Sequence, residues 1–303
     1  MAKILVTGAL GHIGSKLMEK VYYKLNSSNI SFIDDLSAHK YCSLKYAKGN
    51  LLISRFQDLT VEELKEYDVV IHLAAITNAA ASMLDPEEVE TTNLIDTREF
   101  IDKCAEADVK FVFPSSTSVY GVAADIVKED DDSMINPQSP YAHCKWQIEE
   151  YLRIHTIEYV ILRLGTIYGT SAGMRFHTAI NKFCFDAIYL NKVVVWKENY
   201  LMKRPYLDVN VAVDSLLLAA TTDRLDNNTY NIVSSNIALE TIVDRIKSKC
   251  PHYIDIEFVD TPLLNQYSYE VSSDKIKLIW SYNFKPRPMS EAIAGTMQWL
   301  GAK

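Results

Sequence analysis

The chain has 303 residues, of which 48% are hydrophobic and 23% are charged, which is typical of a soluble globular protein. Its formal net charge of −8 argues against a nucleic-acid partner, because surfaces that bind nucleic acid concentrate lysine and arginine. The longest apolar stretch, near residues 69–84, is interrupted by polar residues and is too short to span a bilayer, so we expect no membrane segment.

The chain contains five cysteines, and none of them belongs to a Cys-x-x-Cys pair. An odd number of widely spaced cysteines favours reduced thiols in a cytoplasmic protein over a disulfide framework or a zinc site. The acidic run 129–132 is typical of a solvated loop, so we predict no metal site. The N-terminus leads directly into an apolar strand, and we expect no signal peptide.

The first half of the chain alternates short apolar runs with amphipathic segments. The predicted strands cover residues 4–7, 30–33, 51–56, 69–74, 109–113 and 159–164. The predicted helices cover residues 12–25, 61–67, 87–107 and 140–155. Strands that alternate with helices imply right-handed crossovers and a parallel sheet covered on both faces. The pattern therefore predicts an α/β fold with a Rossmann-type doubly wound parallel sheet.

The second half is less regular. Helices are predicted over 176–190, 211–221 and 239–249, and strands over 193–196, 229–233 and 254–259. We expect residues 1–169 to form mainly a dinucleotide-binding domain. Residues 170–303 would form mainly a smaller α/β lobe, with about 204–235 returning to the first domain. A ligand cleft is expected between the two, at the carboxyl ends of the strands.

The first predicted strand runs into a turn with glycines at positions 8, 11 and 14, and a helix follows. Glycines here allow a tight turn, a close approach of a pyrophosphate, and close packing of the helix on the strand. The helix N-terminus then presents free N–H groups to the phosphates. This stretch predicts a dinucleotide site.

Two aspartates follow the next strands. Asp34 lies 20 residues beyond Gly14 and can accept hydrogen bonds from both ribose hydroxyls while repelling a 2′-phosphate, which favours NAD over NADP. Asp58 has two equally supported interpretations. It either accepts a hydrogen bond from the adenine amino group, or it caps the helix that follows.

Tyr141 and Lys145 are separated by four positions at the start of a predicted helix, so their side chains share one face. A nearby ammonium group lowers the pKa of a tyrosine and makes it a better base. Ser116 ends a predicted strand, where sheet ligands bind, and its hydroxyl can hold a substrate oxygen. The order of glycine turn, Asp34, Ser116, Tyr141 and Lys145 predicts catalysis by hydride transfer.

These motifs together resemble an extended short-chain dehydrogenase/reductase of the NAD-dependent epimerase/dehydratase family, which acts on nucleotide sugars. Further matching segments lie at 34–37, 57–59, 72–75, 116–121, 139–145, 163–169, 204–209 and 230–232, together with Asn93. The resemblance covers nearly the whole chain in order. It implies a Rossmann domain, bound NAD, hydride transfer most often at C4 of a sugar, and a homodimer formed by a four-helix bundle of the helices near 87–107 and 140–155.

The resemblance also implies residue roles. Ser116, Tyr141 and Lys145 match the catalytic group. The expected cofactor contacts are Gly8, Gly11, His12, Ile13, Gly14, Asp34, Asp35, Ser37, Asp58, Leu59, Leu73, Ala74, Ala75, Asn93, Tyr141 and Lys145. The expected substrate contacts are Thr77, Ser116, Thr117, Ser118, Tyr141, Thr166, Arg175 and Arg204.

The chain departs from the family pattern at three places. Dehydratases carry Asp-Glu where this chain has Thr117-Ser118, which argues against a 4,6-dehydratase. Thr166 replaces a usual asparagine, and the segment 261–266 lacks a usual diphosphate-binding arginine. Arg175 is a candidate replacement for that arginine, with a solvated surface arginine as the alternative.

The predicted function is oxidation or epimerisation of a nucleotide-activated sugar with NAD. Three alternatives stay open: a net nucleotide-sugar 4-dehydrogenase or 4-keto reductase, a reductase of a non-nucleotide carbonyl compound, and a non-catalytic NAD-sensing protein on the same fold. His72 is expected to be a packed strand residue rather than a base, and His177 either touches the sugar or faces solvent.

Overall fold

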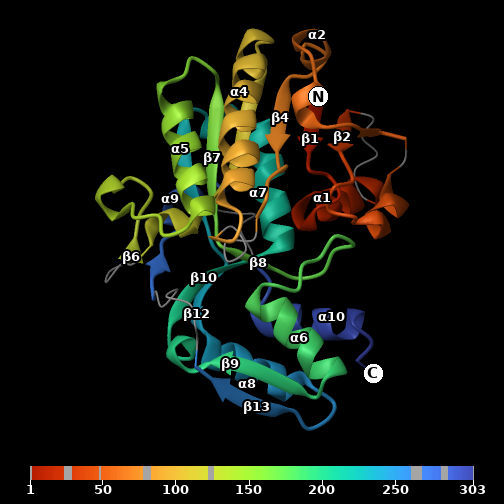
Figure 1. Cartoon of the computed structure of the whole chain (residues 1–303), viewed down its shortest axis with the longest axis vertical. Helices are drawn as coiled ribbons and strands as arrows, with labels where there is room; N and C mark the ends of the chain where they lie inside the picture. The colour runs from red at the N-terminus through yellow and green to blue at the C-terminus, as the bar shows by residue number, and fades with distance from the viewer. Residues whose placement is uncertain are drawn as a thin grey trace.

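The computed structural model describes residues 2–23, 29–47, 49–77, 83–121, 126–260, 268–280 and 286–302. Its centre is a seven-stranded sheet in the order β11-β7-β5-β4-β1-β2-β3, and every neighbouring pair is parallel (Figure 1). The strands are β1 (Ile4–Thr7), β2 (Ile30–Asp34), β3 (Leu51–Ile53), β4 (Val69–His72), β5 (Lys110–Ser116), β7 (Tyr159–Leu164) and β11 (Asn228–Ile232). This sheet confirms the predicted α/β Rossmann-type fold.

Helices cover both faces of this sheet because successive strand residues point to opposite sides. Ile4 and Val6 pack with α1 (His12–Tyr23) and α7 (Val209–Thr221) in one core. Leu5 packs on the other face, in a second core. The helices that contribute to that core are α2 (Val61–Leu64), α3 (Pro86–Glu90), α4 (Asp96–Glu106) and α5 (Pro140–Ile154).

The strands β2 and β3 follow β1 on one side of it, and β4 then lies on the other side, followed by β5, β7 and β11. The strand order therefore reverses between β1 and β4, which are neighbours in the sheet. Ligands of open α/β sheets bind beyond the carboxyl ends of the strands at such a switch point. The glycine turn follows β1 directly, so the fold places it where a dinucleotide binds.

A smaller lobe lies beyond the carboxyl ends of the large sheet (Figure 1). Its strands form a three-stranded sheet, β12-β10-β8, and a pair, β13-β9. Their bounds are β8 (Thr166–Tyr168), β9 (Lys192–Trp196), β10 (Lys203–Asp208), β12 (Ser235–Ala238) and β13 (Asp255–Val259). The third core of the protein packs these strands against α6 (Ala179–Tyr189), α8 (Leu239–Lys249) and α10 (Met289–Trp299).

Segments pass between the two parts more than once. The strand β10 pairs with β8 and β12 in the lobe, whereas α7 and β11 belong to the large sheet and its helix layer. The remaining elements are β6 (Ile126–Val127), β14 (Glu270–Val271) and α9 (Asp274–Ile279), with short 3-10 turns at Tyr41–Tyr46, Phe56–Asp58, Thr117–Tyr120, Asp132–Met134, Lys197–Asn199 and Asp223–Leu225.

Several predicted elements differ from the observed ones in their bounds, and two of them differ in the kind of structure. The strand predicted over 51–56 ends at Ile53 and is followed by the 3-10 turn Phe56–Asp58, which buries Phe56 under the sheet. The helix predicted over 87–107 contains a π-helical turn, Thr91–Ile95. Such turns insert one extra residue and are frequent at functional sites. Here the turn contains Asn93, whose buried side chain has a bonding role described below.

Two further observations bear on the sequence-based expectations. All five cysteines are free thiols. Within the described residues, no helix is both long and apolar enough to cross a membrane.

Candidate active site

The glycine turn leaves no room for side chains on its inner side. Gly8 has φ of 63°, and a Cβ placed on it would lie 2.6 Å from the Ala74 nitrogen. A Cβ on Gly14 would lie 2.6 Å from the carbonyl oxygen of Gly8. A Cβ on Gly11 would meet only the Gly8 oxygen, at 3.3 Å. The helix α1 begins at His12, and the N–H groups of its first turn have no acceptor within the helix. The cradle therefore fits a pyrophosphate.

Asp34 ends β2 beside this turn, and two backbone bonds fix its carboxylate. Its Oδ2 accepts from the Leu10 nitrogen and its Oδ1 from the Leu36 nitrogen, both at 2.9 Å. Burial raises the pKa of this carboxyl group, and the two backbone bonds oppose that rise. Each oxygen keeps a further lone pair for a ribose hydroxyl. The neighbouring Asp35 accepts a hydrogen bond from the Ser37 hydroxyl at 2.6 Å.

The structure excludes one of the two interpretations of Asp58. Thr60 is the N-cap of α2 and forms a capping box with Glu63, so the interpretation of Asp58 as the cap is wrong. Asp58 ends the preceding 3-10 turn, where Arg55 Nη2 lies 3.3 Å from its Oδ1. The side chain of Leu59 is buried in the core beneath α2 and α4.

Ser116, Tyr141 and Lys145 meet where β5 ends and α5 begins. Ser116 is the last residue of β5 and is hydrogen-bonded to Tyr141. The Ser118 hydroxyl donates to Ser116 Oγ at 2.9 Å. Burial raises the pKa of Tyr141, while Arg175 and the bond with Ser116 oppose that rise. The catalytic group expected from the sequence is thus brought together by the fold.

The ammonium group of Lys145 is buried below the tyrosine. Its Nζ donates to the carbonyl oxygen of Pro114 at 2.8 Å and lies 4.4 Å from the Phe113 ring centroid. Burial lowers the pKa of this ammonium group to about 8. Its Nζ lies 5.9 Å from the centroid of the Tyr141 ring. A positive charge at this position favours the phenolate form of the tyrosine.

A buried ionic network that the sequence did not reveal lies behind these residues. Glu149, one helical turn after Lys145, accepts two hydrogen bonds from Arg163, at 3.0 Å to Nε and 2.6 Å to Nη2. The Ser115 hydroxyl donates to the same carboxylate. Arg163 Nη1 lies 2.7 Å from the hydroxyl of Tyr120. The network fixes β5 against α5 and β7. Arg163 begins one of the segments that match the family, but no motif marked Glu149 as its partner.

The loop Gly169–Arg175, which we call the strap, crosses the glycine turn. His12 Nε2 lies 2.8 Å from the Gly169 oxygen, and the Ser171 hydroxyl donates to the His12 oxygen at 2.8 Å. A Cβ on Gly173 would lie 2.2 Å from the oxygen of Leu10, which shows how closely the strap approaches. Lys40 Nζ lies 3.5 Å from the Met174 oxygen at the far end of the strap.

Asn181, in the first turn of α6, holds both ends of the strap. Its Oδ1 accepts from the Gly169 nitrogen at 3.0 Å, and its Nδ2 donates to the Arg175 oxygen at 3.1 Å. This asparagine is fully buried. No sequence motif indicated a role for Asn181, because its two partners are backbone groups of a loop without a recognisable motif.

The strap brings Arg175 to the catalytic group. Its Nη1 donates to the hydroxyl of Thr77, which follows β4, and its charge lowers the pKa of Tyr141. The alternative of a solvated surface arginine is wrong, because its Nε is buried and desolvation lowers the pKa of the guanidinium. The adjacent His177 is exposed, and its pKa is lowered to about 4 by desolvation and by Arg175.

The other expected substrate residues approach from the lobe. Thr166 begins β8 and pairs in register with Tyr206 of β10. Arg204, also on β10, acts electrostatically on Tyr206 and on Tyr269. The Tyr269 hydroxyl lies 3.4 Å from that of Thr117, next to Ser116. The segment 261–266, where the family arginine is missing, lies outside the described residues.

Asn93 and His72 have structural roles around β4. The amide of Asn93 donates to the Ile76 oxygen and accepts from the Ile76 nitrogen, both at 2.8 Å, and so fixes the loop before Thr77. His72 is buried among three phenylalanines, with Nδ1 3.0 Å from the Thr7 hydroxyl, and burial lowers its pKa to about 3. It is therefore a packed strand residue, as expected. Ala74 donates to the same Thr7 hydroxyl at 3.1 Å, between Leu73 and Ala75.

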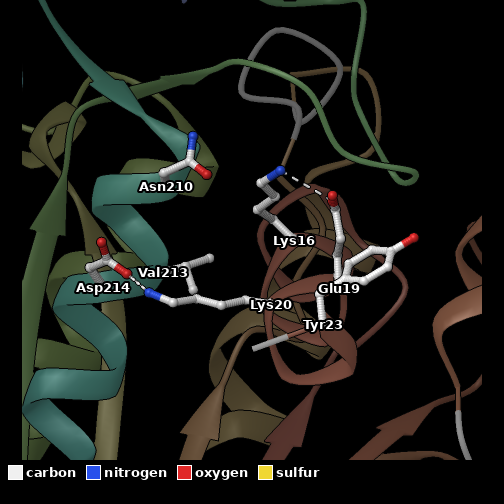
Figure 2. A pocket seen from close by; sticks show the side chains of 7 residues that line it. All are labelled: Lys16, Glu19, Lys20, Tyr23, Asn210, Val213 and Asp214. Atoms are coloured by element: carbon white, nitrogen blue, oxygen red, sulfur yellow. Dashed lines mark hydrogen bonds and ion pairs between the residues drawn. The ribbon is translucent and has the colours of Figure 1, made fainter. Parts of the chain in front are cut away.

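A separate pocket lies between α1 and α7 (Figure 2). Its lysines are paired with carboxylates: Lys16 with Glu19 at 3.1 Å, and Lys20 with Asp214. None of the expected site residues lines it. Among the described residues, no group of histidines, cysteines and carboxylates is arranged to hold a metal ion.

Comparison with known proteins defines the class. The profile of the NAD dependent epimerase/dehydratase family matches residues 4–233, so the chain is a member of that family and its cofactor is NAD. It is 27% identical over 310 residues to a putative UDP-glucose 4-epimerase of Methanocaldococcus jannaschii, covering 98% of each chain.

Other relatives catalyse different reactions of the same family. The chain is 26% identical over 321 residues to a dTDP-D-glucose 4,6-dehydratase of Mus musculus, covering 98% of this chain and 88% of that protein. The UDP-N-acetylglucosamine 4-epimerase of Methanobrevibacter ruminantium M1, solved in complex with UDP-N-acetylmuramic acid, superposes with a TM-score of 0.85 at 25% identity, covering 99% and 98%. The protein is thus an enzyme of the epimerase/dehydratase family.

Proposed function

We propose that the protein oxidises a nucleotide sugar at C4 and reduces the keto sugar again, as a 4-epimerase does. The observation that carries this proposal is the convergence of Ser116, Tyr141 and Lys145 beside the glycine turn. The names of the 4-epimerase relatives support the same reaction.

The residues divide the work as follows. Tyr141, as phenolate, accepts the proton of the C4 hydroxyl, and Ser116 hydrogen-bonds the same oxygen. Bound NAD supplies the hydride acceptor in this step and the hydride donor in the return step. Lys145 keeps a positive charge below the tyrosine and so stabilises the phenolate. Asp34 holds the adenosine ribose, and the α1 N-terminus at His12 and Ile13 receives the pyrophosphate.

The residues after Ser116 favour epimerisation over dehydration. A 4,6-dehydratase needs an acid to expel the C6 hydroxyl, and Thr117 and Ser118 offer none. A net 4-dehydrogenase catalyses the same oxidation but releases the keto sugar and leaves the cofactor reduced. A 4-keto reductase catalyses the reverse reaction and leaves the cofactor oxidised. The reduction state of the cofactor after turnover separates these two functions.

The test is a panel of UDP-, dTDP- and GDP-sugars incubated with the protein and NAD. We expect at least one sugar to yield its C4 epimer without lasting absorbance at 340 nm, whereas accumulation of reduced cofactor would indicate a net dehydrogenase. Tyr141→Phe should lower the rate by about 10²–10⁴-fold. Tyr151→Phe, on the exposed side of the same helix, is the matched control and should react normally. An unchanged rate in Tyr141→Phe would refute the assignment, and binding of sugar nucleotides without formation of any product would favour an NAD-sensing protein.

We also propose a homodimer formed through α4 and α5. Ile95, just before α4, is 49% exposed, and Ile154, at the end of α5, is 83% exposed. These helices are the ones that the family resemblance implies for the four-helix bundle. Light scattering of the purified protein should give twice the chain mass, and Ile95→Asp with Ile154→Asp should give a monomer.

A further inference from the structure

Arg175 is partly buried, and the described residues supply no carboxylate that pairs with its charge. Its Nη1 donates to Thr77, and its Nε is buried without any hydrogen-bond partner. Among the described residues it forms no ion pair, unlike Arg163, which is neutralised by Glu149. A guanidinium whose Nε is buried without a partner is costly unless an anion completes the site. The arrangement therefore indicates that a bound ligand supplies the anion.

The position of Arg175 indicates which part of the ligand carries the negative charge. The guanidinium bonds Thr77, directly beyond β4, and its charge reaches Tyr141. Asn181 fixes its backbone, so the side chain is held at the reacting end of the cleft. Arg204, the other arginine of the expected substrate site, acts instead on Tyr206 and Tyr269. The two arginines therefore have different neighbours and serve different groups.

We propose that the substrate is an acidic sugar nucleotide whose sugar carboxylate binds Arg175. This inference rests on the proposed function and names its substrate class. A carboxylate on the carbon next to C4 lies close to the oxygen that Tyr141 deprotonates, so one molecule can reach both groups.

The chemistry of the site favours a carboxylate over a more highly charged group. The planar guanidinium presents two parallel N–H donors to a carboxylate, and the Nε edge is the unoccupied one. The nearby histidines add no charge, because desolvation lowers the pKa of His12 to about 3 and that of His177 to about 4. Arg175 therefore offers one positive charge to one negative charge.

Matched pairs of ligands test the proposal on the unmodified protein. We would measure the Kd of UDP-glucose against UDP-glucuronate, UDP-N-acetylglucosamine against UDP-N-acetylglucosaminuronate, and dTDP-glucose against dTDP-glucuronate, each in the presence of NAD. Calorimetry gives these values independently of turnover. The acidic member of at least one pair should bind about 10–100-fold more tightly.

Variants assign the preference to the residue. Arg175→Met should weaken binding of the acidic sugar about 10–100-fold and change that of the neutral sugar little. Arg175→Lys keeps the charge without the paired donors, so its affinity for the acidic sugar should lie between that of the unmodified protein and that of Arg175→Met. Arg245→Met is the matched control, because Arg245 is also partly buried but lines a different pocket in the lobe. It should preserve the preference.

Three outcomes would overturn the proposal. Tighter binding of every neutral member refutes the acidic substrate while the proposed function stands. Equal weakening of both members and of NAD in Arg175→Met assigns the arginine to a pyrophosphate. No binding of any sugar nucleotide by the unmodified protein refutes the proposed function itself, and with it the inference.

Discussion

His12 Nε2 lies 2.8 Å from the carbonyl oxygen of Gly169, which is 157 positions later in the chain. Because a carbonyl only accepts, the histidine carries its proton on Nε2. This bond ties the start of α1 to the strap. The glycine turn and the strap that leads into the smaller lobe are therefore held together by this contact.

The strap depends on a glycine that no motif predicted. Gly173→Ala would place a Cβ 2.2 Å from the Leu10 oxygen, so the strap has to move. We expect a loss of about 1–3 kcal/mol in the free energy of unfolding, together with weaker NAD binding. Gly295→Ala is the control: in α10 its Cβ meets only the end of Arg287, at 3.7 Å. It should stabilise the protein by about 0.5–1 kcal/mol. Urea unfolding measures both, and equal effects would contradict the packing described.

Asp34 should decide between NAD and NADP. Its carboxylate repels a 2′-phosphate, so the unmodified protein should prefer NAD. Asp34→Asn removes the charge, and we expect the ratio of the two affinities to fall by about tenfold or more. Asp35→Asn, in which the neighbouring carboxylate is lost, should keep the ratio. Fluorescence titration with the two reduced cofactors measures the ratio of the affinities. An unchanged ratio in Asp34→Asn would refute the role of this residue.

The Glu149–Arg163 pair should be the most sensitive ionic contact of the fold. Both side chains are fully buried, and removing one charge leaves the other without a partner. Glu149→Gln should therefore cost about 3–5 kcal/mol. The exposed pair of Lys65 and Glu62 is the comparison, and Glu62→Gln should change stability little. Replacing both buried residues by apolar ones should recover part of the loss. Chemical denaturation at constant pH checks each variant.

Acid should destabilise the protein through its buried histidines. The pKa of His72 is lowered to about 3 by burial, so the unfolded chain binds its proton first as the pH falls below 6.5. The contribution of the neutral histidine to stability is complete above that pH and is lost on descent toward 3. At pH 5 this linkage amounts to about 2 kcal/mol. His72→Phe should therefore lose less stability between pH 7.5 and pH 5 than the unmodified protein, and identical losses would contradict the assignment.

The sequence determined the fold class, the cofactor and the order of the residues proposed for catalysis. These features depend on local patterns: apolar runs of fixed spacing, glycines where a turn admits no Cβ, and two side chains four positions apart on one helix. Such patterns can be recognised in the sequence because residues close together in the chain form them. The π-helical turn around Asn93 and the capping of α2 by Thr60 were local as well, yet competing signals obscured them.

Only the tertiary structure decided which distant groups meet. Asn181 holds the strap, Glu149 neutralises Arg163, and Thr77 receives Arg175. Each contact joins elements from different parts of the chain, and its partner is a backbone group or a charge that composition does not mark. The buried and unpartnered Nε of Arg175, close to Tyr141 and without a carboxylate partner among the described residues, results from the packing of the cleft and from no single segment.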